Sequence, residues 1–277
     1  MTPAANRDPV RVAVCQLDLR IGEPERNRAA AEDAVREAAA HQARIVVLPE
    51  LTPSGYVFTG AAEARSLAEP AAGPTVSHLS SMAAELGLVI AGGFAELGED
   101  GAVYNSAVIV GPAGSSAIYR KAHLWDAEAD CFSPGSAEPP VVDQPHGRIG
   151  VLICYDAEFP EWVRRPALAG AELLAVPTNW PAEPVPAGER PNVVVNIQAA
   201  AFANRIFIAA ACRTGTERGV AWTGGSIIAG PDGYPLAGPA GTDPGLLYAD
   251  CDLARARSKA NGPRNDVHAD RRLDLYA

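Results

Sequence analysis

The chain has 277 residues, of which 48% are hydrophobic and 20% are charged, so it holds enough apolar material for a large globular core and is not a disordered chain. Its formal net charge of −10 argues against nucleic acid or an acidic membrane surface as the main partner, because either would require a basic face. No apolar run approaches the ~20 residues needed to span a bilayer, and the first ten residues contain no apolar segment typical of a secretory signal.

The first half of the chain alternates strand-like and helix-like segments. Helices are predicted over residues 24–43, which begin with a favourable proline, and over 75–86, with Thr75 as the N-cap and Gly87 as the stop. Short apolar runs predict strands at 11–17, 45–48, 88–94, 103–110 and 117–121. A turn at 111–114 is expected to join the strands 103–110 and 117–121 into a hairpin.

The second half begins with residues 122–147, which hold many Pro, Gly and acidic residues and predict a long functional loop. Strands are predicted at 148–154, 173–176, 206–212, 225–229 and 245–250, and helices at 160–169, 192–204 and 253–260. No repeat, linker or composition break divides the chain. We therefore expect residues 1–277 to form one α/β domain, with a partly parallel, partly antiparallel sheet covered by helices.

The five cysteines are an odd number, are spread along the chain and form no CxxC pair. Neither a disulfide framework nor a zinc ribbon is expected from this pattern. A reducing compartment is the natural setting for such a chain, so the sequence predicts a cytoplasmic protein.

Three of the predicted strands end on residues with reactive side chains, namely Glu50, Lys121 and Cys154. In α/β folds, the ends of strands are where catalytic groups are commonly placed. Glu50 could accept the proton of the Cys154 thiol, and Lys121 could stabilise first the thiolate and then the oxyanion of a tetrahedral intermediate. Such a set would perform acyl transfer by covalent catalysis, with no metal and no organic cofactor.

Each of these residues alone also has a structural interpretation. Glu50 could be a solvated loop carboxylate, Lys121 could flank an edge strand, and Cys154 could be an inert core residue. Their joint occurrence favours the catalytic interpretation.

Around these residues lie the segments VVLPELTPSGY (46–56), YRKAHLWDAEADCFSPG (119–135) and GVLICYDAEFPEW (150–162). They resemble the three signature segments of the nitrilase superfamily of carbon–nitrogen hydrolases. The resemblance implies a four-layer α-β-β-α sandwich, with subunits paired into a homodimer or a higher homo-oligomer. It also implies that residues 261–277 form a C-terminal tail that contacts the dimer partner.

By position, the resemblance assigns Glu50, Lys121 and Cys154 as the catalytic residues and Glu128 as a second, supporting glutamate. Without it, Glu128 would be taken for a loop carboxylate in an acidic segment. The backbone N–H of Tyr155 would help Lys121 to hold the oxyanion, and His123 is expected to be structural or to lie at the rim. Candidate substrate-binding residues, of which each aromatic could equally be packing, are Tyr56, Trp125, Tyr155, Asn179 and Trp180.

The string CYDAEFPE, which begins at Cys154, resembles the aliphatic and ω-amino amidase groups of this superfamily. We therefore expect hydrolysis of a small primary amide to a carboxylic acid and ammonia, through a thioester on Cys154. A nitrilase or an N-carbamoyl amine hydrolase would use the same residues, and both remain alternatives. A family member that has lost catalysis and binds a small ligand or a protein is the alternative outside enzymology.

Overall fold

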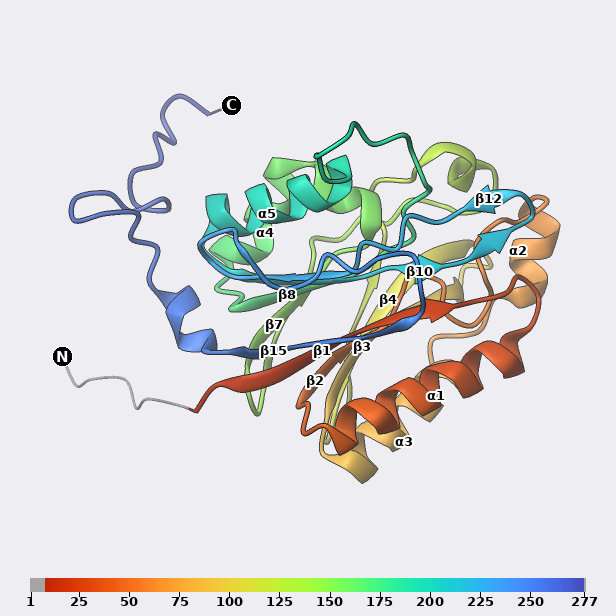
Figure 1. Cartoon of the computed structure of the whole chain (residues 1–277). Helices are drawn as coiled ribbons and strands as arrows, with labels where there is room; N and C mark the ends of the chain where they lie inside the picture. Colours follow the sequence, from red (N-terminus) through yellow and green to blue (C-terminus); the bar gives the residue numbers. More distant parts are fainter. Residues whose placement is uncertain (1–7, 277) are drawn as a thin grey trace.

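Two β-sheets form the frame of the protein in the computed structural model, which describes residues 8–276 (Figure 1). The first sheet has the order β10-β1-β2-β3-β4-β5, and β15 also pairs with β1. Its strands are β1 (Val10–Asp18), β2 (Ile45–Val47), β3 (Val89–Leu97), β4 (Val103–Gly111), β5 (Gly114–Arg120), β10 (Arg213–Thr214) and β15 (Gly245–Cys251). Residues 1–7, where no secretory signal is expected, lie outside the described range.

The second sheet has the order β14-β13-β9-β8-β7-β6. Its strands are β6 (Val141–Gln144), β7 (Gly147–Val151), β8 (Leu173–Pro177), β9 (Phe207–Ala211), β13 (Ile227–Ala229) and β14 (Pro235–Ala237). A separate short ribbon pairs β11 (Thr216–Glu217) with β12 (Val220–Ala221). In both sheets the central pairs are parallel and the outer hairpins are antiparallel, which matches the predicted mixture.

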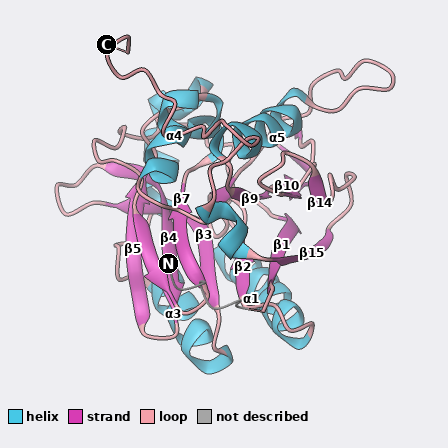
Figure 2. Cartoon of the chain, turned by 90° about the vertical axis from the view of Figure 1, so that its left-hand side faces the viewer, coloured by secondary structure: helices cyan, strands magenta, loops and turns pink. Residues whose placement is uncertain are grey.

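Helices cover the outer face of each sheet. α1 (Pro24–Ala40) and α3 (Pro74–Leu86) lie on the first sheet, and α4 (Pro160–Leu168) and α5 (Asn192–Asn204) lie on the second. The view turned by 90° shows the strands between these two pairs of helices (Figure 2). A further helix that the sequence did not reveal, α2 (Ala61–Leu67), contacts β3.

The alternation of side chains along β2 explains the layering. Ile45 and Val47 belong to a core cluster that also contains residues of the second sheet, such as Val151 and Leu174. Val46 points the other way, into a cluster with residues of α1 and α3. The sheets therefore pack face to face with helices outside, and the predicted four-layer α-β-β-α sandwich is confirmed.

The structure corrects several predicted boundaries. Thr75 is not the N-cap of α3, because Gly73 occupies that position and Thr75 lies in the first turn, where its N–H donates to Glu69. The segment 122–147 is not wholly a loop, since it contains a 3-10 helix (Asp126–Asp130) and β6. The predicted helix 253–260 is a shorter 3-10 helix, Leu253–Arg257. The strand β6 within the expected loop was missed because it forms by pairing with β7, and the local composition of residues 141–144 does not encode that contact.

Residues 261–276 extend away from both sheets (Figure 1). Within residues 8–276, no helix is both long enough and apolar enough to cross a membrane.

Candidate active site

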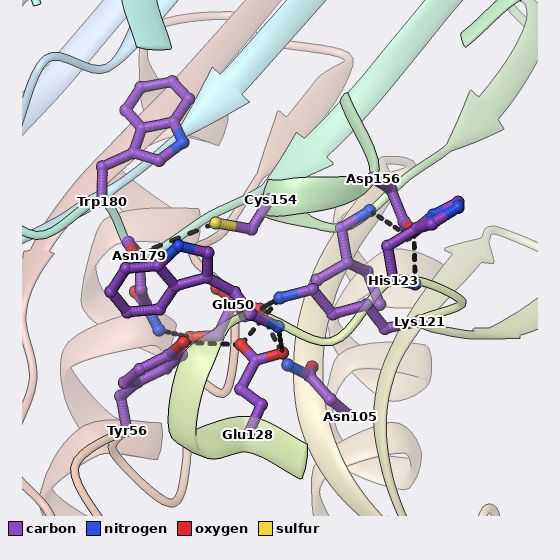
Figure 3. Close-up of polar contacts among 12 residues, drawn as sticks. Glu50, Tyr56, Asn105, Lys121, His123, Glu128, Cys154, Asp156, Asn179 and Trp180 are labelled. Atoms are coloured by element: carbon purple, nitrogen blue, oxygen red, sulfur yellow. Dashed lines mark hydrogen bonds and ion pairs between the residues drawn. The ribbon is translucent and has the colours of Figure 1, made fainter. Parts of the chain in front are cut away.

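Four strands of the two sheets bring the predicted catalytic residues to one place (Figure 3). Lys121 directly follows β5, whereas Glu50 and Cys154 each come three residues after a parallel strand, β2 and β7 respectively. Asn179 comes two residues after β8, which is parallel to β7. Within each sheet, the carboxyl ends of neighbouring parallel strands share one edge. The Asn179 amide, from the second sheet, donates to the Glu50 carbonyl, from the first, at 2.9 Å, so the two edges meet at this site.

Glu50 is fully buried, and its two carboxylate oxygens have different surroundings. Oε1 accepts hydrogen bonds from Asn105 Nδ2 at 2.7 Å and from Lys121 Nζ at 2.8 Å. Within the described part of the chain, Oε2 has no hydrogen-bond partner. A Cβ atom at Gly93 would lie 2.6 Å from the Cα of Glu50, so glycine is required there for β3 to pass so closely.

Lys121 lies between two carboxylates. Besides Glu50, it donates to Glu128 Oε1 at 2.7 Å, and the Glu128 side chain is itself buried in the 3-10 helix Asp126–Asp130. The hydroxyl of Tyr56 donates to the same Oε1 at 2.6 Å, while the backbone N–H of Trp125 donates to Oε2 at 3.0 Å. Three donors thus fix the position of the Glu128 carboxylate.

Burial and neighbouring charges shift the pKa values of Glu50 and Lys121 in opposite directions. Burial raises the pKa of Glu50 to about 7, because the lowering effect of the Lys121 charge is smaller than the desolvation. For Lys121, burial lowers the pKa, but the charges of Glu50 and Glu128 outweigh it and hold the pKa well above its ordinary value. The lysine is therefore a permanent cation, and Glu50 can exchange a proton near neutral pH.

Cys154 begins a 3-10 helix, Cys154–Glu158, and has a left-handed φ of 46°. Such a backbone is unfavourable for a residue with a side chain and is common at functional sites. Burial raises the pKa of the Cys154 thiol well above its usual value, and the charge of Glu50 adds to this effect, while Lys121 opposes it. The thiol is thus protonated at rest, and its reaction as a nucleophile requires a base.

His123 contacts a different acid, Asp156. Its Nδ1 lies 2.7 Å from Asp156 Oδ1, and its ring stacks on Phe159 with centroids 3.9 Å apart. The hydroxyl of Tyr119 donates to Asp156 Oδ2 at 2.8 Å, and the N–H of Ile153 donates to the same atom at 3.3 Å. Asp156 therefore ties the segment after Lys121 to the turn that carries Cys154, and the position of His123 agrees with a structural role.

A cavity of about 590 Å³ opens onto Cys154. Four of the predicted substrate-binding residues line it, namely Trp125, Tyr155, Asn179 and Trp180. The fifth, Tyr56, lines a separate apolar pocket of about 160 Å³, which Trp125 also borders. The Tyr56 hydroxyl donates to Glu128 in this structure, and the role of Tyr56 toward a substrate stays a prediction.

Several residues of the site were missed by sequence reasoning. Asn105, fully buried on β4, had a signal, since its amide and the neighbouring hydroxyl interrupt an apolar run. Glu158, Glu183 and Arg190 also line the cavity. Glu158 lies within the signature segment 150–162, but the sequence did not assign any of the three to substrate binding. The ion pair of Arg213 with Glu217, which contacts the Tyr56 backbone, had no local signal at all.

Comparison with known proteins places this site in a family. A model of the carbon–nitrogen hydrolases matches residues 11–261. The chain belongs to the carbon–nitrogen hydrolase family. A protein called nitrilase from Pyrococcus abyssi is 37% identical over 269 residues, which cover 96% of this chain and 99% of that protein. An N-carbamoylputrescine amidase from Solanum tuberosum is 37% identical over 268 residues, which cover 90% of this chain and 88% of that protein.

Solved structures agree with this assignment. A mutant amidase from Nesterenkonia sp. AN1, which belongs to the nitrilase superfamily, carries acrylamide added to its active-site cysteine. It superimposes with a TM-score of 0.78 at 30% identity, covering 96% of this chain and 98% of the amidase. This carbon–nitrogen hydrolase is accordingly an enzyme of the amidase-like branch of the nitrilase superfamily, and it acts on carbon–nitrogen bonds other than peptide bonds.

Proposed function

We propose that this carbon–nitrogen hydrolase is a cysteine-dependent amidase that converts a small primary amide into a carboxylic acid and ammonia. The observation that carries the proposal is the surroundings of Glu50. One of its oxygens is held by Lys121 and Asn105, and the other is buried and without a hydrogen-bond partner in the described part of the chain. A carboxylate so placed, with a pKa near 7 and a protonated thiol nearby, is suited to act as a general base.

In the first half-reaction, Glu50 takes the proton of the Cys154 thiol, and the thiolate attacks the carbonyl carbon of the amide. A carbon–sulfur bond forms, and the carbonyl oxygen becomes an oxyanion that Lys121 and the backbone N–H of Tyr155 stabilise. Collapse of this intermediate breaks the carbon–nitrogen bond. Glu50 returns its proton to the leaving nitrogen, so ammonia departs and a thioester remains on Cys154.

In the second half-reaction, Glu50 removes a proton from water, and the resulting hydroxide attacks the thioester carbonyl. The second tetrahedral intermediate breaks its carbon–sulfur bond and releases the carboxylic acid. Glu50 then returns the proton to the thiolate of Cys154. Lys121 keeps its charge through both steps, because its second carboxylate partner, Glu128, stays beside it while Glu50 takes up and returns the proton.

The cavity lining favours amides with a positively charged end within the proposed class. Glu158 and Glu183 both line the cavity. Partial burial, and then the charge of Glu183, raise the pKa of Glu158. An ammonium group on the substrate would relieve this repulsion. Arg190 lines the same cavity, but its guanidinium donates to Gln198 at 2.6 Å. An ω-amino amide therefore suits the site better than an acidic one.

A matched substrate panel tests the proposal. Ammonia release is measured with short aliphatic amides, ω-amino amides of equal length, the corresponding nitriles and N-carbamoyl amines, with Cys154→Ala as the control. Release from amides but not from nitriles, absent in the variant, is expected. Ammonia release from N-carbamoyl amines alone would instead favour an N-carbamoyl amine hydrolase, like the Solanum relative by its name. If no substrate gives ammonia release that depends on Cys154, a ligand-binding protein is favoured.

The assembly and location also belong to this proposal. The C-terminal residues Leu273, Leu275 and Tyr276 have exposures of 63%, 68% and 57%. Large apolar side chains on a projecting tail are suited to cover by another subunit. We expect a cytoplasmic homodimer or larger homo-oligomer, and sedimentation of the full chain against a variant truncated after residue 260 measures the contribution of the tail.

A further inference from the structure

An ion pair of Arg213, on β10, and Glu217, on β11, is buried against the loop that follows Glu50. Arg213 is 0% exposed and Glu217 is 4% exposed, and Arg213 Nη2 lies 2.8 Å from Glu217 Oε1. The guanidinium donates a hydrogen bond to the carbonyl of Leu19 and lies 4.8 Å from the ring centroid of Trp222. Within residues 8–276, Arg213 Nε and Nη1 have no hydrogen-bond partner.

Stability alone does not account for this pair. Removing two charges from water is costly, and the remaining unpaired N–H groups of Arg213 increase that cost. Replacing a buried ion pair by apolar side chains of similar size is often neutral or stabilising. A role in fixing a particular geometry is therefore the more economical explanation.

The other carboxylate oxygen of Glu217 holds the backbone beside the catalytic site. Its Oε2 accepts hydrogen bonds from the N–H groups of Tyr56 at 2.8 Å and of Val57 at 2.7 Å. A Cβ atom at Gly55, where φ is 80°, would lie 2.8 Å from Glu217 Oε1, so glycine allows the loop to approach. The edge of Trp222 packs against the Tyr56 ring, with centroids 5.3 Å apart and planes at 82°.

From Tyr56 the contacts continue to the catalytic lysine. The Tyr56 hydroxyl donates to Glu128 Oε1 at 2.6 Å, and that same oxygen accepts from Lys121 Nζ at 2.7 Å. Neither Arg213 nor Glu217 is among the described residues that line the cavity. The pair therefore acts on the reaction indirectly, and its hydrogen bonds lead to the catalytic group through Tyr56 and Glu128.

We propose that Arg213 and Glu217 are positioning residues, which hold the Tyr56 backbone so that its hydroxyl fixes Glu128 and, through it, the ammonium group of Lys121. Arg213 orients the Glu217 carboxylate, and that carboxylate sets the loop. The inference rests on the proposed roles of Glu128 and Lys121, and it predicts an effect on the rate at Cys154 rather than on substrate affinity.

Two double variants isolate the contact between Glu217 and the loop. Arg213→Met/Glu217→Leu removes both charges and the acceptor, whereas Arg213→Met/Glu217→Gln removes the charges but keeps an acceptor for the two N–H groups. The rate of Cys154 alkylation by iodoacetamide is measured by mass spectrometry, together with kcat and KM for an accepted amide. We expect the Leu variant to be slower than the Gln variant by roughly 10-fold or more in alkylation and in kcat, with KM changed by less than about three-fold.

A matched pair elsewhere in the chain controls for general destabilisation. Glu69 likewise accepts a backbone N–H, that of Thr75 at 2.7 Å, and pairs with Arg28 at 2.9 Å, but it has no contact with the catalytic group among the described residues. Arg28→Met/Glu69→Leu is expected to lower the melting temperature and leave Cys154 alkylation unchanged. In a Tyr56→Phe background, the difference between the Leu and Gln variants should largely vanish, because the link to Glu128 is already broken.

Equal alkylation rates and equal kcat in the Leu and Gln variants would overturn the positioning role. So would a Leu–Gln difference that persists in full in the Tyr56→Phe background. The alkylation readout requires no substrate, so it separates this inference from the proposed amidase activity. If the wild-type chain releases no ammonia from amides, the substrate class fails, while the alkylation rates still decide the role of Glu217.

Discussion

The ammonium nitrogen of Lys121 lies 2.8 Å from Oε1 of Glu50, and neither side chain has any exposure to solvent. In this arrangement the lysine orients one carboxylate oxygen and leaves the other free to exchange a proton. In the proposed mechanism, this contact separates two functions, because Glu50 acts as the base while Lys121 remains a cation for the oxyanion.

Glu50→Gln should lower kcat by roughly 10³-fold or more, because an amide cannot take the thiol proton and the base acts as one unit with the nucleophile. Ammonia release from an accepted amide measures this loss. Glu172→Gln is the control, since Glu172 is also a buried carboxylate but precedes β8, at the opposite end of the sheet from Cys154. Near-normal turnover by Glu50→Gln would exclude Glu50 as the general base.

The pH dependence should report the raised pKa of Glu50. A base must be ionised to accept a proton, so kcat/KM should rise with pH through a pKa of about 7. An ordinary glutamate, with a pKa of about 4.3, would place this rise far lower. Values of kcat/KM between about pH 5 and pH 8 measure this rise. A kcat/KM that does not change over that range would contradict Glu50 as the base.

Tyr56→Phe should lower kcat by roughly 10-fold, because Glu128 loses a donor to its charged oxygen and no longer holds Lys121 as firmly. Glu128→Gln should cost more than Tyr56→Phe but less than Glu50→Gln. Tyr104→Phe is the matched control, since that hydroxyl donates to Asp100 at 2.6 Å, away from the catalytic group. Steady-state kinetics of the four variants measure the order, and a Glu128→Gln loss larger than that of Glu50→Gln would reverse the proposed roles.

Glu183→Gln should reduce kcat/KM for an ω-amino amide by roughly two- to five-fold and leave kcat/KM for an uncharged amide of equal length unchanged. The expected loss is small because an ion pair between the exposed Glu183 carboxylate and the substrate ammonium group contributes little free energy. Glu189→Gln serves as the control, as Glu189 lies on the same loop but is not among the cavity-lining residues that the structure describes. Equal losses for both amides would show that Glu183 does not recognise a charged group.

Much of the frame could be predicted from local sequence. Continuous apolar runs predicted β2 and β8, a mostly apolar segment predicted β1, and the helix 192–204 was predicted with the bounds of α5. The prediction that reactive residues follow strands was useful because parallel strands share one edge of a sheet. The reactive residues lie together although the strand ends were not predicted correctly (Figure 3). The strand expected over 148–154, for example, is β7, which ends at Val151.

What the sequence could not predict depends on contacts between distant segments. Glu128 lies in a stretch with no periodicity, and its orientation depends on a 3-10 helix and on a hydroxyl 72 positions away. Glu217 reaches the Tyr56 backbone across 161 positions. No local pattern encodes such pairs, so only resemblance suggested a role for Glu128 and nothing suggested one for Glu217.

Ammonia release by the Cys154→Ala variant is the most direct test of the proposed covalent mechanism. Cys15→Ala is the matched control, because Cys15 is also a buried cysteine but belongs to the cluster between the first sheet and its helices. We predict that Cys154→Ala folds and loses at least roughly 10³-fold in rate on a short amide, while Cys15→Ala stays active. Turnover by Cys154→Ala at a rate near that of the wild type would show that the amide is not hydrolysed through a thioester on this residue.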